Sequence, residues 1–186
     1  MNPHMFEKET LKNINLYSKK VGISLALLGS LAILANVIFP NIKIDIFIGL
    51  FLFFTGILIA FILYKNYYEN RLSILHPLIP LISGLVFLTL PLKHDLAILI
   101  TIVFYLFLDG FIKSAIGISY KPLKKYRYII YSGAFSILLA MFIVFGWPLT
   151  NYWLLKLIVG ANIFFDGIMF FNFSYGIEDE LKQLQT

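Results

Sequence analysis

Residues 96–118 have the sequence LAILITIVFYLFLDGFIKSAIGI, in which Asp109 and Lys113 are the only charged residues. A helix of about 20 apolar residues crosses the ~30 Å hydrocarbon core of a bilayer. In lipid a helix satisfies its own backbone hydrogen bonds, whereas an open strand leaves them unpaired. The stretch therefore predicts a transmembrane helix with two charges in its second half.

Five more runs of the same character lie on either side of this stretch. The six runs are 21–39, 44–64, 72–90, 96–118, 128–145 and 152–173. Hydrophobic residues make up 60% of the chain and charged residues 13%, against about 25% charged residues in soluble domains. The predicted fold class is an all-α integral membrane protein with six transmembrane helices.

The breaks between the runs are of two kinds, and they predict three helical hairpins in series. Short turns that contain Pro40, Pro91 and Pro148 join the runs in pairs, and polar connectors separate the pairs. The hairpins are expected at 21–64, 72–118 and 128–173, within a transmembrane domain of residues 21–173. Residues 1–20 are expected to form an N-terminal arm, amphipathic enough to lie on the membrane surface, and residues 174–186 a tail.

The distribution of Lys and Arg predicts the orientation. With the N-terminus inside, 12 of the 15 Lys and Arg residues fall on the side of the arm, the polar connectors and the tail. They are Lys8, Lys12, Lys19, Lys20, Lys65, Arg71, Lys113, Lys121, Lys124, Lys125, Arg127 and Lys182. Cytoplasmic loops are enriched in basic residues, so we expect a multi-pass protein of the plasma (inner) membrane with both termini in the cytoplasm.

Basic residues at the inner flank also suggest the partners. Lys121, Lys124, Lys125 and Arg127 follow one another in the second connector, where such a cluster attracts anionic lipid head groups. Because the charge follows the topology, nucleic acid is not an expected partner. A homo-oligomer is left open. Lys156, four residues from the outer end of its helix, is expected to extend its ammonium to the interface.

The second and third hairpins repeat each other without a gap at an offset of 57 residues. Pro91 aligns with Pro148, and the segment FLDG at 107–110 aligns with FFDG at 164–167. The first hairpin fits with a turn three residues shorter, and it places FFTG at 53–56 in the same position. All three hairpins enter and leave on one side, so the repeats are predicted to be parallel and related by an axis along the membrane normal.

The proline turn followed by an apolar helix that ends in Asp-Gly resembles the HdeD family of acid-resistance membrane proteins. The closest stretch is WPLT at 147–150, followed by WLL at 153–155, Gly160 and FDG at 165–167. The resemblance covers roughly residues 21–173 and implies a link to acid stress, without a known reaction or substrate. Two positions depart from the repeat: Thr55 replaces the aspartate, and Val103 stands where the other repeats have Gly49 and Gly160.

Asp109 and Asp166 are the main candidate site residues. A carboxylate inside a membrane is costly and faces protein or water, so it suggests a function by default. The alternative is helix packing, with Lys113 at the same-face i,i+4 spacing from Asp109. Thr55 at the equivalent position cannot carry a proton, which favours packing over a proton relay. Asn162, in the same run as Asp166, is explained by an interhelical hydrogen bond.

The other titratable residues give weaker indications of function than Asp109 and Asp166. His94 and Asp95 lie on an outer turn, where they are either solvated turn residues or a pH sensor. No nucleophile–base pair, phosphate loop or metal-ligand cluster is visible, so neither an enzyme nor a cofactor is expected. The expected function is a non-enzymatic membrane protein with a structural or protective role in acid stress. The alternative is a small proton-linked transporter or channel that uses the intramembrane aspartates.

Overall fold

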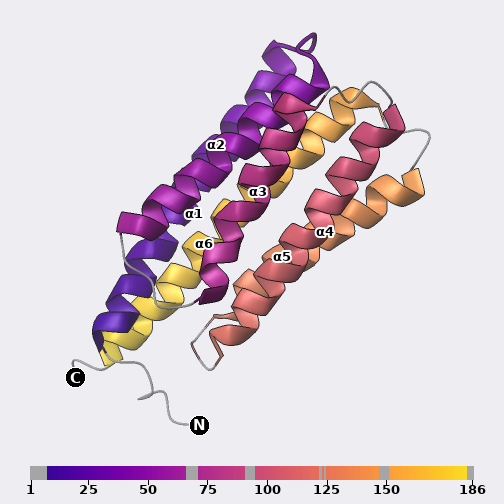
Figure 1. Ribbon diagram of the computed structural model, residues 1–186. Coiled ribbons are helices and arrows are strands. Elements are labelled where there is room, and N and C mark those ends of the chain that lie inside the picture. The colour runs from indigo at the N-terminus through magenta and orange to yellow at the C-terminus, as the bar shows by residue number, and fades with distance from the viewer. Residues whose placement is uncertain are drawn as a thin grey trace.

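The computed structural model describes residues 8–65, 71–90, 95–121, 123, 125–146 and 151–183, and within them the secondary structure is entirely helical. The helices form one elongated bundle (Figure 1). They are α1 (Lys8–Ile38), α2 (Ile44–Lys65), α3 (Arg71–Thr89), α4 (Asp95–Ser119), α5 (Arg127–Gly146) and α6 (Tyr152–Gln183). Each of the six apolar runs thus coincides with part of one helix, to within one residue at its end.

Five of these helices, α1, α2, α4, α5 and α6, are long and apolar enough to cross a membrane. The apolar part of α3 is shorter and covers Ile74–Thr89. Large apolar side chains point away from the bundle along the helices; Leu27, Phe104 and Leu138 are each more than 60% exposed. A water-soluble protein rarely exposes so much apolar surface, so the chain has the architecture of an all-α, multi-pass membrane protein.

The most extensive packing is not within the predicted hairpins. The pairs α2–α3, α4–α5 and α1–α6 are in the most extensive contact, whereas the helices of each predicted hairpin contact each other less. Small residues explain this preference, because they let helix backbones approach closely. A Cβ added to Gly133 on α5 would lie 2.5 Å from the carbonyl oxygen of Gly110 on α4.

The predicted N-terminal arm and C-terminal tail are not separate elements. α1 is continuous from Lys8 and α6 is continuous to Gln183, so the predicted boundaries at residues 20 and 173 fall inside helices. Leu11, Ile14 and Tyr17 are buried, because α1 and α6 run side by side along the bundle (Figure 1). Residues 8–20 thus form the first part of α1 and pack on α6, and their position relative to the membrane surface stays a prediction.

The start of α1 and the end of α6 lie at the same end of the bundle (Figure 1). With 31 and 32 residues, these helices are about 46–48 Å long at 1.5 Å per residue. This exceeds a ~30 Å hydrocarbon core. The extra length carries the polar ends of both helices beyond the apolar part of the bundle.

Candidate functional site

A buried polar cluster joins α4, α5 and α6. Its members are Asp109 and Lys113 on α4, Ser132 and Ser136 on α5, and Asn162 and Asp166 on α6, and all six are buried. The Asp-Gly pairs of the repeat help to form it. Gly110, next to Asp109, lies against α5, and Gly167, next to Asp166, lies against α1, so the glycines permit close packing while the carboxylates meet in the interior.

Lys113 lies at the centre of the cluster. Its ammonium donates to Oδ2 of Asp109, one turn earlier on the same helix, and to Oδ2 of Asp166 on α6. The ammonium thus links two carboxylates that lie 57 residues apart in the sequence. Lys113 was counted with the basic residues of the cytoplasmic flank, and the structure corrects this, because its side chain is fully enclosed.

Hydroxyl and amide groups surround the two carboxylates. The Ser132 hydroxyl donates to Oδ1 of Asp166 at 2.5 Å. The Asn162 amide donates to Oδ2 of Asp109 at 3.2 Å, and the Ser136 hydroxyl lies 3.1 Å from the same oxygen and 2.7 Å from Oδ1 of Asn162. Both aspartates therefore bond side chains of neighbouring helices, which is the arrangement that the packing interpretation predicts.

The charges of the cluster do not balance when every group is in its ordinary ionic form. Two carboxylates face one ammonium, which leaves one negative charge in an apolar interior, where an uncompensated charge is costly. His76 on α3 is buried and stacks on Phe170 at 5.1 Å between ring centroids. Its Nδ1 has no hydrogen-bond partner, and the ring interacts electrostatically with Lys113 and Asp109. One added proton, on either carboxylate or on His76, would bring the net charge of Asp109, Lys113, Asp166 and His76 to zero.

Thr55, the counterpart of the aspartates in the first repeat, does not join the cluster. It is buried on α2, and its hydroxyl donates to the carbonyl of Phe51 on its own helix at 2.7 Å. Thr55 thus contributes no bond to the cluster of α4, α5 and α6.

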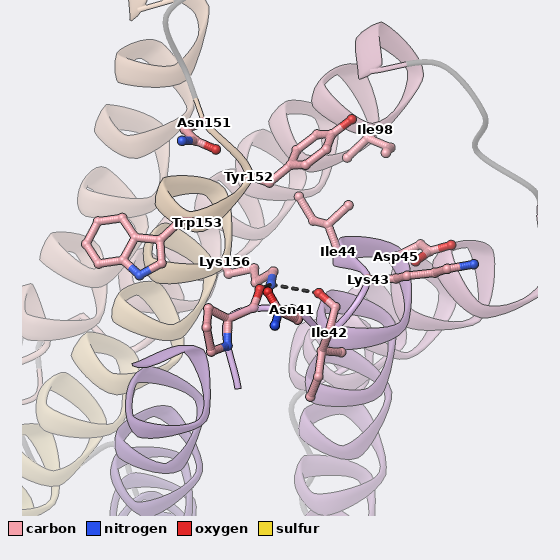
Figure 2. A pocket seen from close by; sticks show the side chains of 11 residues that line it. Asn41, Ile42, Lys43, Ile44, Asp45, Ile98, Asn151, Tyr152, Trp153 and Lys156 are labelled. Carbon is pink, nitrogen blue, oxygen red and sulfur yellow. Dashed lines mark hydrogen bonds between the residues drawn. The ribbon is translucent and has the colours of Figure 1, made fainter. Parts of the chain in front are cut away.

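The other predicted residues lie elsewhere. His94 falls outside the described residues, and Asp95 begins α4 with a side chain that is likewise outside the description. Lys156 is buried, and its ammonium donates to the carbonyl oxygens of Pro40 and Ile42, at the end of the bundle (Figure 2). It therefore fastens the turn between α1 and α2 to α6.

Ser132 and Ser136 were not among the predicted site residues, although one signal was available. They are four residues apart, and two serines at this spacing share a helix face. His76 on α3 is a further buried polar residue, and it lies near Lys113 and Asp109 of the cluster.

In the described parts of the chain, no group of three or more His, Cys, Asp or Glu side chains is arranged to hold a metal ion. Comparison with family models, with curated proteins and with solved structures finds no match.

Proposed function

We propose that the chain is a non-enzymatic, polytopic membrane protein whose buried cluster holds three helices together. One observation carries this proposal: Lys113 bridges Asp109 and Asp166, and serine and asparagine side chains of α5 and α6 bond the same carboxylates. Each of these hydrogen bonds either joins two helices or orients a side chain within the cluster. Buried polar networks that are fully bonded rigidify and specify a single packing.

The proposal includes six membrane spans, with both termini in the cytoplasm of a cell bounded by a plasma (inner) membrane. The position of both helix ends at one end of the bundle supports an even number of spans. α3 would be the sixth span, its short apolar part covered by close packing on α2. Reporter fusions after Asn70, Tyr126 and Thr186 should then give a cytoplasmic signal, and fusions after Asn41 and Thr150 an external one. A C-terminus outside would refute this topology.

We also propose that the six helices are three parallel repeats. In the contact pattern, the second helix of each hairpin packs on the first helix of the next, and α6 packs on α1. That order is what a threefold arrangement about the membrane normal requires, because the third repeat must close onto the first. A rotation that superposes α3–α4 on α5–α6 about an axis across the bundle, rather than along it, would contradict the proposal.

The resemblance to the HdeD family extends the proposal to a protective role in acid stress. The test is the survival of a deletion strain at low pH after complementation with the wild-type chain or with Lys113→Met. If the bundle itself protects the cell, the wild type restores survival. With Lys113→Met, survival should rise only in proportion to the amount of folded protein in the membrane. Equal survival with and without the chain would remove the stress role but leave the structural one.

A proton-linked transporter or channel is the second candidate, and the unbalanced charge of the cluster favours it. Two carboxylates, one ammonium and the unbonded Nδ1 of His76 form a group that one proton neutralises. A transporter would need that proton to exchange with both sides of the membrane. Proton flux through reconstituted vesicles separates the two functions.

The basic residues of the connector between α4 and α5 supply the proposed contact with lipid. Lys121, Lys125 and Arg127 are exposed, and Lys124 lies outside the described residues. Lys125 also lies 3.9 Å from the exposed Asp179 carboxylate near the end of α6. Replacing all four basic residues with Gln should weaken binding to vesicles that contain anionic lipid, and unchanged binding would count against this partner.

A further inference from the structure

A pocket of about 480 Å³ opens at the end of the bundle where α2, α4 and α6 begin. Figure 2 shows Lys43 and Asp45 at the start of α2, Ile98 near the start of α4, and Asn151, Trp153 and Lys156 at the start of α6 around it. No residue of the buried cluster lines this pocket. A volume of this size lies in the range of small-molecule sites, about 300–1,000 Å³.

Lys156 supplies a buried positive charge to the pocket. An ammonium group has three N–H donors, and two of them bond the carbonyl oxygens of Pro40 at 2.9 Å and Ile42 at 2.7 Å. In the described part of the chain, the ion pairs are made by Lys113, Lys125 and Lys182, and no carboxylate pairs with Lys156. The third donor of the ammonium has no protein acceptor in the described part of the chain, so it can bond an anion in the pocket.

The ends of the helices add to the positive character of the pocket. The first N–H groups of a helix have no partner within the helix, and with the helix dipole they favour anions. At the start of α2, the Asp45 side chain provides one such partner, because its Oδ1 accepts a hydrogen bond from the backbone N–H of Ile46 at 2.8 Å. The first turn of α6 contains no acidic residue. Among the residues that line the pocket, Asp45 is the one acidic side chain, against the two basic side chains of Lys43 and Lys156, so the pocket carries more positive than negative charge.

We propose that this pocket binds a phosphate-type oxyanion, with the Lys156 ammonium at its floor, the first turn of α6 beside it and the exposed Lys43 at its rim. The volume exceeds that of a bare phosphate and leaves room for a small organic group against Trp153. Such a phosphate has two sources: a soluble phosphorylated molecule, or the head group of a phospholipid at the end of the helices. The proposal does not depend on the function of the buried cluster.

Tryptophan fluorescence provides the test, because Trp147 and Trp153 are the only tryptophans in the chain. Trp147→Phe leaves Trp153, at the pocket wall, as the sole reporter. Purified lipid-free protein in detergent is titrated with inorganic phosphate and with glycerol 3-phosphate. The same protein in vesicles of digalactosyldiacylglycerol, which lacks phosphate, is titrated with phosphatidylglycerol. The variants are Lys156→Met and Lys43→Ala, and Lys12→Met at the opposite end of α1 is the matched control.

A saturable change in fluorescence is expected, about tenfold or more weaker in Lys156→Met, since a charge-assisted hydrogen bond is lost. It should also be weaker in Lys43→Ala and unchanged in Lys12→Met. A response to the soluble phosphates identifies a free ligand, and a response to phosphatidylglycerol alone identifies a head group. If Lys156→Met does not fold, Lys43→Ala decides. The absence of a response in both arms, or a response equal in wild type and Lys43→Ala, would overturn the proposal.

Discussion

Replacement of Lys113 by Met should destabilise the bundle more than any other single change in charge. The substitution keeps an unbranched side chain but removes the ammonium that Asp109 and Asp166 share. Lys113 is fully buried, so water cannot replace the lost bonds. Removal of one partner from a buried ion pair costs about 3–5 kcal/mol, because the remaining charge stays uncompensated. For a chain of this length that loss lowers the midpoint of thermal unfolding by roughly 6–20 °C.

The assay is thermal unfolding of the detergent-solubilised protein, followed by helical circular dichroism. The matched control is Lys12→Met, which removes an exposed lysine near the start of α1. This control should leave the midpoint unchanged. A triple variant, Lys113→Met with Asp109→Asn and Asp166→Asn, removes all three charges and should recover most of the lost stability. A Lys113→Met protein as stable as the wild type would refute the bridging role of this lysine.

Three further predictions concern the packing of the helices. Gly133→Ala should destabilise by about 1–3 kcal/mol, since the new Cβ would lie 2.5 Å from a carbonyl oxygen of α4. Gly160→Ala should cost less, because the atom nearest to its new Cβ would be 3.2 Å away. Equal unfolding midpoints for the two variants would contradict this prediction. Thr55→Val should change stability by less than about 1 kcal/mol, because its hydroxyl bonds only its own helix; a larger loss in the same unfolding assay would reveal a partner on another helix. Asp166→Leu should cost about 1–3 kcal/mol, because it leaves the Ser132 hydroxyl without its acceptor and the Lys113 ammonium with one carboxylate instead of two. Asp166→Asn should be milder, and the reverse order of the two midpoints would argue against packing.

The helices and one contact of the site could be predicted from local sequence. Runs of about 20 apolar residues are sufficient to place helices, because lipid leaves the backbone few alternatives. The pair Asp109–Lys113 follows from the i,i+4 spacing on one helix. The bridge from Lys113 to Asp166 could not be predicted in this way. It depends on how α4 and α6 are rotated toward each other, and helices that are apolar all round carry little information about rotation.

The extent of α1 could not be decided from its pattern either. Leu11, Ile14 and Tyr17 recur at helical spacing, and an amphipathic stretch of this kind fits equally a helix on a membrane surface and a helix packed on a neighbour. The structure provides the neighbour, because α6 continues past the apolar part of the bundle to Gln183. Likewise, the short turns suggested hairpins as the packed units, whereas glycines on facing helices set the closest pairs.

The most direct test of the structural role is proton flux into vesicles that contain the purified protein, driven by a pH difference and read with a pH-sensitive dye. If the cluster serves to hold α4, α5 and α6 together, vesicles with wild-type protein should acidify no faster than empty vesicles or vesicles with Asp166→Asn. A flux that depends on the wild-type protein, and that disappears in a folded Asp166→Asn variant with an unchanged unfolding midpoint, would contradict the structural role and establish the cluster as a proton pathway.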